Sequence, residues 1–372
     1  MSAHVIPPLF GLATIFLAST SVVTAPDKRE LIVSTAPQLV AAVRQARGGE
    51  RIRLAPGLYP PVTLQNISPG RVVTLTSRDP ADPAILTGLF LRNSGNLTLS
   101  GLTLRSAGSP VQHGFTLHRV HDVSLDQVRV TGRPGPIGRA QDKLLLVRDS
   151  RDVGITRSEF TNSFTAISLL DTHNATITGN YLHHLRMDGV RGGGNLHIVI
   201  AENVITDFAP APGDHPDGIQ MWTSRQGSAA SNITIRGNII DRGAGAAMQG
   251  IFLRDEKSGL PYRDVVIADN IVIGAMYNGI AVLSKSPSLV VKDNVVARFP
   301  DQKSWIRVQE GARLTGNAAP LYLIGAAAPA TPPSNTVMPV TGDRGRSALR
   351  RWISNRSMAG YHATWRQQAP GL

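Results

Sequence analysis

The chain has 372 residues, no cysteine and a net charge of +12, from 38 Lys and Arg against 26 Asp and Glu. Without cysteine a disulfide-stapled scaffold is excluded, and a chain of this length buries a large core without staples. The excess of positive charge predicts an anionic partner.

Residues 1–25 predict a cleaved signal peptide. They contain no Lys, Arg, Asp or Glu, are apolar from Val5 to Ala18, and end in the small-residue pattern Val23-Thr24-Ala25. A basic n-region is missing, and an uncleaved membrane anchor is the alternative. No second apolar span of about 18 residues follows, so we expect no membrane span after cleavage and a secreted or periplasmic protein.

A short helix is predicted over residues 37–47, where Leu39, Val40 and Val43 have helical spacing. We expect it to cap the N-terminal end of a strand stack, where bare strand edges invite aggregation. The segment from Ile52 to Tyr59 then predicts a first strand and turn.

Six asparagines end the same short phrase, of which Ile177-Thr178-Gly179-Asn180 is one example. Their separations are 23, 35, 32, 24 and 23 residues, a period that marks a stacked repeat architecture. The flanking residues are β-branched, which favours strands. Asn suits such a corner because it tolerates the left-handed region and forms amide ladders. The six are Asn180, Asn203, Asn238, Asn270, Asn294 and Asn317.

A second strand is predicted after each asparagine. It begins with a polar residue, which is followed by a residue that is usually small and then by a branched apolar residue. Fainter coils with the same alternation, but without the asparagine, begin near Leu97, Val123 and Val153. At least two strands per coil predict an all-β parallel β-helix over residues 31–317. The second strands begin Asp188-Gly189-Val190, Asp217-Gly218-Ile219, Gln249-Gly250-Ile251 and Asn278-Gly279-Ile280.

Insertions place a candidate site in the middle of the stack. The step from Asn180 to Asp188 is 8 residues, whereas the step from Asn203 to Asp217 is 14. The return legs from Asp217 and Gln249 are longer as well, and long loops on a rigid solenoid commonly carry binding surfaces. We expect these loops to wall a groove beside the second strands.

Asp188 and Asp217 occupy equivalent positions in adjacent coils, so their carboxylates should lie close together. Two such carboxylates repel unless they share a proton or a cation, and Ca²⁺ suits hard carboxylate oxygens. Arg191 or His215 is an alternative source of compensating charge. A third interpretation is a polar corner ladder with Gln249 and Asn278 that serves only the fold.

The C-terminal part has a different composition. Residues 326–333 are rich in Ala and Pro and predict a linker, and residues 334–372 form a basic tail or cap. A short helix within 347–358 would cover the C-terminal end of the stack. Docking to an anionic surface is the alternative.

The capping helix, the Ala55-Pro56-Gly57-Leu58-Tyr59 opening and the Gly-Asn coils together resemble the right-handed, single-stranded parallel β-helix proteins of the pectate-lyase-like superfamily. That resemblance implies secreted polysaccharide lyases, glycoside hydrolases, uronate epimerases or adhesins, and fold alone does not choose among them. The alginate-lyase and chondroitinase-B-like branch is the most similar. It implies a Lys and an Arg as base and acid with Ca²⁺ on carboxylates, whereas this chain has Asp-His-Pro-Asp at 214–217.

The preferred hypothesis is β-elimination on an acidic, uronate-containing polysaccharide by a monomeric lyase, with no nucleic acid as partner. Arg191 would neutralise the uronate carboxylate, and His215, oriented by Asp214 or Asp217, would move the proton near neutral pH. The candidate catalytic residues are His215, Asp217, Asp214, Arg191 and Arg254. Substrate would be bound by Trp222, Gln220, Lys257 and His184, and Asp188 with Asp217 would hold Ca²⁺.

Three alternatives remain open from the sequence. Hydrolysis would use Asp188, Asp214 and Asp217 as acid and base, as in polygalacturonase-like β-helices. C5 epimerisation would use the same proton abstraction without bond cleavage. A non-catalytic glycan-binding β-helix would need none of these groups individually.

Overall fold

The computed structural model describes residues 30–108, 113–224, 226–256, 259–340, 342–354 and 356–368. The expected signal peptide, residues 1–25, and Lys257 lie outside the described residues.

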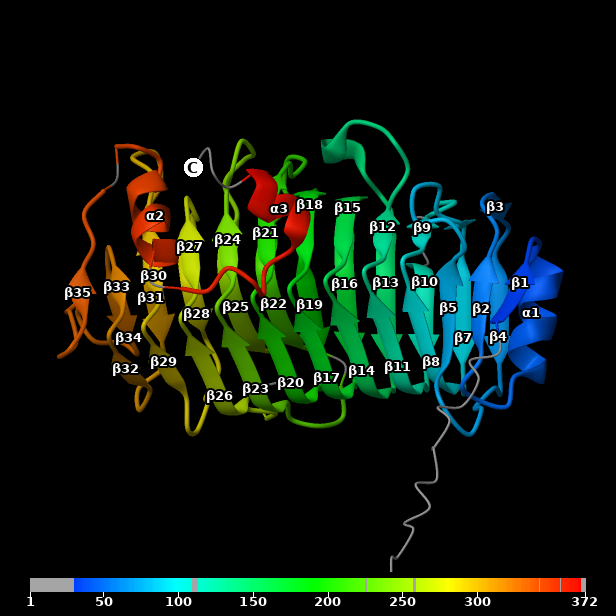
Figure 1. Cartoon of the computed structure of the whole chain (residues 1–372). Coiled ribbons are helices and arrows are strands. Elements are labelled where there is room, and N and C mark those ends of the chain that lie inside the picture. Colours follow the sequence, from blue (N-terminus) through cyan, green and yellow to red (C-terminus); the bar gives the residue numbers. More distant parts are fainter. Residues whose placement is uncertain are drawn as a thin grey trace, which may run out of the picture.

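Each complete coil contributes one strand to each of three parallel sheets, so the predicted parallel β-helix is confirmed (Figure 1). Sheet A contains β1 Glu30–Val33, β2 Arg51–Leu54, β5 Val73–Ser77, β8 Gly95–Ser100, β11 His121–Asp126, β14 Arg151–Thr156, β17 His173–Thr178, β20 Leu196–Ala201, β23 Ser231–Arg236, β26 Arg263–Ala268, β29 Val290–Lys292 and β32 Arg313–Thr315.

Sheet B follows sheet A within each coil, and sheet C follows sheet B. Sheet B contains β3 Leu58–Tyr59, β6 Ile85–Leu86, β9 Thr103–Arg105, β12 Arg129–Thr131, β15 Glu159–Ser163, β18 Tyr181–Leu185, β21 Val204–Phe208, β24 Ile239–Asp241, β27 Ile271–Ile273, β30 Val295–Ala297, β33 Ala318–Ala319 and β35 Thr336–Val337. Sheet C contains β4 Val62–Gln65, β7 Leu89–Arg92, β10 His113–His118, β13 Lys143–Arg148, β16 Thr165–Leu170, β19 Val190–Gly193, β22 Asp217–Thr223, β25 Gln249–Asp255, β28 Tyr277–Val282, β31 Ser304–Val308 and β34 Tyr322–Ile324.

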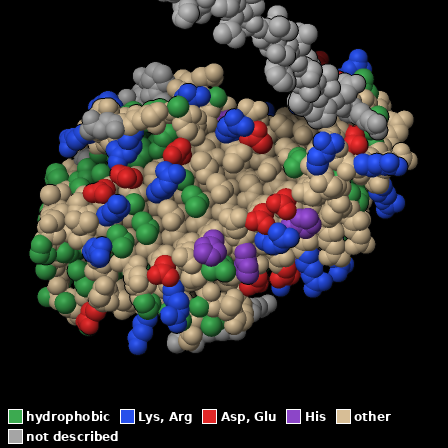
Figure 2. Space-filling model, turned by 60° about the horizontal axis from the view of Figure 1, so that its bottom comes forward, with side chains coloured by type: hydrophobic (Ala, Val, Ile, Leu, Met, Phe, Trp, Pro, Cys, Tyr) green, Lys and Arg blue, Asp and Glu red, His purple; other side chains and the backbone are tan. Residues whose placement is uncertain are grey.

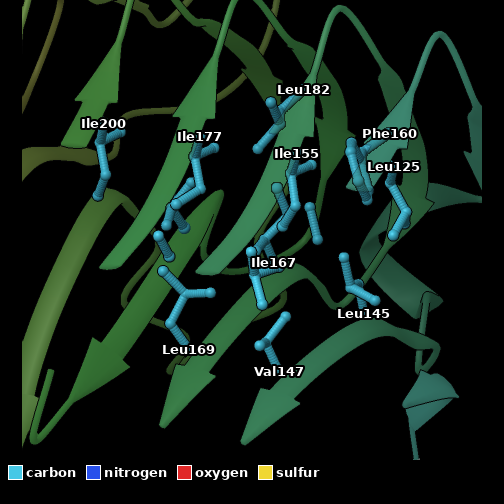
Figure 3. Close-up of a cluster of buried hydrophobic side chains, with 14 of the residues drawn as sticks. Leu125, Leu145, Val147, Ile155, Phe160, Ile167, Leu169, Ile177, Leu182 and Ile200 are labelled. Atoms are coloured by element: carbon cyan, nitrogen blue, oxygen red, sulfur yellow. The ribbon is translucent and has the colours of Figure 1, made fainter. Parts of the chain in front are cut away.

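The core is a column of branched apolar side chains inside the coils. Alternation along each strand turns every second side chain inward. The register then places like residues above one another, as in Ile155, Ile177 and Ile200 of sheet A. Figure 3 shows these three beside Phe160 and Leu182 of sheet B, all fully buried. The same register also stacks the outward side chains, so residues at equivalent positions of successive coils form rows on the surface.

The asparagines form a continuous buried ladder at the corner between sheets A and B. Each Nδ2 donates to Oδ1 of the next asparagine, at 2.9 Å from Asn238 to Asn270. The left-handed residue at this corner is the one before the asparagine, such as Gly237 at φ 64°, so the backbone reason expected for Asn was wrong. The side chain is needed instead to bond both neighbouring coils. In the preceding coil Asn238 Nδ2 donates to the Ile200 carbonyl and Asn238 Oδ1 accepts the Asn203 N–H, and in the following coil Nδ2 donates to the Asn270 side chain.

The ladder extends beyond both predicted ends. Ser158 holds the corner before Asn180, and its N–H donates to Asn180 Oδ1 at 2.9 Å. At the other end Asn317 Nδ2 donates to Asn335 Oδ1 at 2.8 Å, and β35 pairs with β33. The coil stack therefore continues to Val337, and the stretch predicted as a linker is a loop within the last coil.

Helix α1, Ala36–Gln45, lies beside the first strands at the N-terminal end (Figure 1). Its Leu39 and Val43 are fully buried in the core of the first coils. The Thr35 hydroxyl caps the helix by accepting the Gln38 N–H at 3.3 Å.

The C-terminal helices α2, Arg346–Ser354, and α3, Ala363–Gln368, lie along the side of the stack on sheet B (Figure 1). Trp352 and Trp365 pack in one cluster with outward apolar residues of sheet B, including Ile271. The prediction that a helix covers the C-terminal end of the stack is therefore wrong. The outward apolar residues of sheet B form an apolar strip along the side, and the two helices bury it. The short helix η1, Ile137–Arg139, lies in the loop before β13. In the described ranges we find no helix with the length and apolar character needed to cross a bilayer.

The outer surface of sheet A is mostly neutral. Its central row runs through Thr98, Ser124, Gly154, Thr176 and Thr234. Figure 2 turns forward the side on which the sheet A strands are labelled in Figure 1, and shows neutral groups in the middle with Lys, Arg, Asp and Glu around them. This face does not gather charge of one sign.

Candidate functional site

The outer face of sheet C gathers the chemically active side chains in three parallel rows, fixed by the strand register. The first row is His113, Lys143, Thr165, Asp188, Asp217, Gln249 and Asn278. The second row is Thr116, Leu146, Ser168, Arg191, Gln220 and Phe252. The third row is His118, Arg148, Leu170, Gly193, Trp222 and Arg254.

Asp188 and Asp217 are adjacent in the first row and fully buried, with 0% and 1% of their surface exposed. The Asp217 N–H donates to Asp188 Oδ1 at 3.3 Å, and Asp217 Oδ2 accepts from Gln220 Nε2 at 2.7 Å. Arg191 Nη1 lies 3.5 Å from Asp188 Oδ2. Within the described chain, Asp188 Oδ2 and Asp217 Oδ1 are buried without a hydrogen bond. The site therefore holds two carboxyl groups and only one nearby cation.

Burial makes this pair retain protons. It raises the pKa of Asp188 to about 6, against the opposing effect of Arg191. Burial and the charge of Asp188 raise the pKa of Asp217 well above its usual value. Near neutral pH the pair therefore holds a proton, because two adjacent buried carboxylates cannot both ionise at low cost.

Glycines after the two aspartates allow the close packing. A Cβ on Gly189 would lie 2.6 Å from the Gly218 carbonyl oxygen, and one on Gly218 would lie 2.5 Å from Ile240 Cγ2. Only glycine fits between neighbouring backbones at this bend. The polar, glycine, apolar pattern thus recurs at the start of β10, β22, β25 and β28 and directly before β19.

Asp214 and His215 lie in the inserted loop before β22. Asp214 accepts from Arg186 Nε at 2.7 Å and from the Ala211 N–H at 2.8 Å, and the bond from Arg186 lowers the pKa of Asp214. Arg186 itself lies over the Phe164 ring, 5.1 Å from its centroid. Asp214 therefore anchors the loop as an ionised carboxylate. His215 is exposed at the rim.

An imidazole that the sequence did not identify lies on the other side of Arg191. His113 Nε2 is 3.2 Å from Ser168 Oγ, and Ser168 is the register partner of Arg191. Burial, together with the charges of Lys143 and Arg191, lowers the pKa of His113 to about 4, so its ring is neutral at pH 7. The signal was present, because His113-Gly114-Phe115 repeats the pattern of Asp188-Gly189-Val190.

An aromatic platform continues this outer face of sheet C, here called the groove. The rings of Trp222 and Phe252 stack at 5.9 Å between centroids, and the Arg254 guanidinium lies 5.4 Å from the Trp222 ring. The predicted outward set of Arg191, Gln220, Trp222 and Arg254 thus shares one face. Gln220 is half-buried there and bonds Asp217.

Towards the N-terminal end the first two rows become neutral, whereas Arg92 continues the third row. A hollow of about 520 Å³ lies over β4, β7 and β10. Pro61, Phe90 and Thr116 line it, and His113 stands where it meets the charged part.

His184 is not part of this groove. It lies on β18 of sheet B, and its Nδ1 contacts His183 Nδ1 at 2.5 Å. The hypothesis that it binds substrate beside Asp188 assumed that residues of one coil share a face. A turn between β18 and β19 carries the chain from sheet B to sheet C, so the two residues face different sides.

The donor set does not fit Ca²⁺. The ion takes six to eight oxygen ligands, whereas Asp188 and Asp217 offer two carboxyl groups with a guanidinium beside them. Across the residues that the structure describes, no three His, Asp or Glu side chains converge as a metal site would require. A shared proton and Arg191 balance the pair instead.

The fold and these rows define a parallel β-helix protein with charged and aromatic side chains along the outer face of one sheet. A family model described as right handed beta helix region matches residues 87–296, so the chain belongs to that family. No curated protein matches the sequence significantly.

Solved structures align with this chain at low identity. The surface protein and adhesin PfbA of Streptococcus pneumoniae is 13% identical, aligns with 81% of this chain and 94% of its own, and has a TM-score of 0.57. An alginate lyase from Paenibacillus sp. is 13% identical over 84% of this chain and 98% of its own, with a TM-score of 0.42. A polygalacturonase from Erwinia carotovora is 14% identical over 86% and 98%, with a TM-score of 0.42.

Proposed function

We propose that the protein cleaves an acidic, uronate-containing polysaccharide by β-elimination in the groove over sheet C. The observation that carries this proposal is Arg191, whose side chain is 40% exposed above a buried, proton-holding carboxyl pair. Because the pair retains a proton, it does not fully engage the guanidinium, which is left to bind a substrate carboxylate. An exported protein is part of this proposal, since residues 1–25 resemble a signal peptide.

The first step is neutralisation of the uronate carboxylate. Arg191 binds the carboxylate of C6 through charge-assisted hydrogen bonds and so makes the C5 proton more acidic. Preorganised charge of this kind is often the largest single contribution to lowering an enzyme's activation barrier.

The second step is removal of the C5 proton. His113 carries a neutral ring at pH 7 and is held by Ser168 next to Arg191, which is the arrangement that a general base needs. As the proton leaves, its electron pair forms the C4–C5 double bond and the bond from C4 to O4 breaks. His215, at the opposite rim, is the other imidazole candidate for this role.

The third step returns a proton to O4. The Asp188 carboxyl faces Arg191, whereas the Asp217 carboxyl contacts the neutral Gln220, and the raised pKa of Asp217 keeps it protonated. We assign it the proton that O4 takes. Trp222 provides an apolar face for a neighbouring sugar ring, with Arg254 beside it.

Hydrolysis is the second candidate, favoured by the adjacent carboxyl groups of Asp188 and Asp217. One protonated and one ionised carboxyl is the acid and base pair of a glycosidase. The likeness to an adhesin makes binding without cleavage a third outcome.

A polymer screen separates the three. Purified protein is incubated with polyuronates and glycosaminoglycans, and both ultraviolet absorbance of unsaturated uronate and new reducing ends are followed. Absorbance with reducing ends is the expected result. Reducing ends alone would indicate hydrolysis, and binding with neither signal leaves an epimerase or an adhesin, which proton exchange at C5 distinguishes. Arg191→Gln is the inactive variant, and Arg263→Gln, exposed on sheet A, is its matched control.

A further inference from the structure

Arginines recur on every second strand of sheet C. The intervening strands β10, β16, β22 and β28 contain no Lys or Arg. Each of these arginines lies in the second or third row, on the outer face. The five are Arg92 on β7, Arg148 on β13, Arg191 on β19, Arg254 on β25 and Arg307 on β31.

The spacing between these cations follows from the fold. Neighbouring strands are about 4.8 Å apart, so alternate strands are about 9.6 Å apart. One coil advances by about the length of one pyranose residue in an extended chain. A polysaccharide lying along the stack therefore meets one guanidinium for every two sugars.

Two of the strands between the arginines, β16 and β22, present neutral groups in the second and third rows. Ser168 and Leu170 face outward from β16, and Gln220 and Trp222 from β22. A hydroxyl, an amide and an indole suit the hydroxyl groups and ring face of a neutral sugar. A second carboxylate at these coils would be desolvated without a cation, and at β22 it would lie beside the buried aspartates.

Two details tie individual arginines to the groove. Arg254 is held over Trp222, which restricts its guanidinium to the sheet surface. Arg148 Nε lies 3.6 Å from Asp149 Oδ2, an exposed pair of the kind that contributes little and does not prevent binding.

We propose that the groove takes a polysaccharide in which a uronate alternates with a neutral sugar, with one carboxylate on each arginine of the series. This inference rests on the proposed function, from which it takes the location of the substrate site on sheet C. It adds the substrate class, because a homopolyuronate would place every second carboxylate against neutral side chains.

Binding is measured in the His113→Gln background, in which we expect polymer to bind without cleavage. The probes are length-matched fragments of hyaluronan, which alternates glucuronate with N-acetylglucosamine, and of polygalacturonate. Calorimetry should give a Kd for the hyaluronan fragment that is at least about tenfold lower than the Kd for the polygalacturonate fragment. A factor of this size corresponds to one charge-assisted contact. Equal or tighter binding of polygalacturonate would overturn the proposal.

Two substitutions sharpen the test. Arg307→Gln should weaken binding of the alternating polymer about tenfold, whereas Arg313→Gln on sheet A, its matched control, should leave it unchanged. Leu170→Arg adds a cation to an intervening strand, where the side chain is partly exposed, and should shift preference towards polygalacturonate. No effect of Arg307→Gln, or no shift with Leu170→Arg, would contradict the alternating register.

The two proposals fail separately. Preference for the alternating polymer without any unsaturated product from the unsubstituted protein would refute β-elimination and keep the substrate class. Cleavage of polygalacturonate in preference to hyaluronan would keep β-elimination and refute the substrate class.

Discussion

The Asp217 N–H donates to Oδ1 of Asp188 at 3.3 Å, so two buried carboxyl groups from successive coils lie side by side. The strand that places them there is otherwise a regular part of sheet C. The stack could have carried an amide or hydroxyl at either position, as it does with Thr165 and Asn278 in the same row. The buried carboxyl pair therefore costs folding free energy that an amide or a hydroxyl in the same row would not.

That cost should appear as a pH-dependent stability. The pKa of Asp188 is raised to about 6 in the folded protein, from 3.8 in the unfolded chain, so the folded state binds more protons between these values. Stability is therefore full below about pH 4 and is lost as pH rises through about 6, by about 3 kcal/mol. Urea unfolding at pH 4, 6 and 8 measures it.

Asp188→Asn should remove the share of this dependence that belongs to Asp188 and leave the share of Asp217, whose pKa is also raised by burial. The variant should unfold at a higher urea concentration than the unsubstituted protein at pH 8. Asp82→Asn, at an exposed position, is the control and should unfold like the unsubstituted protein. A pair that is stabilising when ionised would give the opposite trend with pH.

Arg191→Gln should reduce kcat/KM on the polymer about a hundredfold or more, because the neutral amide cannot balance the carboxylate in the transition state. Initial rates of unsaturated product measure this loss. Arg263→Gln should retain full activity, and a similar loss in both variants would show that Arg191 has no special role.

His113→Gln should abolish turnover. In the unsubstituted protein the His113 pKa of about 4 sets the acid limb of the pH–rate profile. Because the base must be neutral, activity is present above about pH 4 and falls as pH drops through it. His215→Gln should lower activity less than about tenfold, as expected for a rim residue outside the proton transfer. If His215→Gln is inactive and His113→Gln is not, the base is the imidazole of the loop.

Asn238→Ala should destabilise the stack by about 3 kcal/mol, because it removes bonds to Asn270 and Ile200 and leaves buried partners unsatisfied. The shift in urea midpoint measures it. Thr234→Ala, on the outer face of the preceding strand, should cost much less. Equal effects would mean that the amide ladder is not a source of stability.

The sequence predicted what the repeat itself encodes. Asn180 to Asn317 gave the coil period, and the pattern after them placed Asp188 beside Asp217. Ser158 was missed because the corner also accepts a hydroxyl in place of the amide. Asn335 was missed because a loop separates it from the preceding coil.

The errors at the site have a topological cause. His184 was placed with Asp188 because the two share a coil, but the coil has three faces and a turn separates them. His113 was missed because its coil has no corner asparagine, although the chain places it on the same row. Contacts across several strands, such as His113 to Ser168, depend on register and cannot be counted from sequence spacing.

The most direct test of the account is the rate at which unsaturated uronate appears when the protein is given acidic polysaccharides, compared with Arg191→Gln. We expect ultraviolet absorbance to rise together with reducing ends for the unsubstituted protein and to remain near background for the variant. Reducing ends without absorbance, or an equal rise in both proteins, would contradict β-elimination at Arg191.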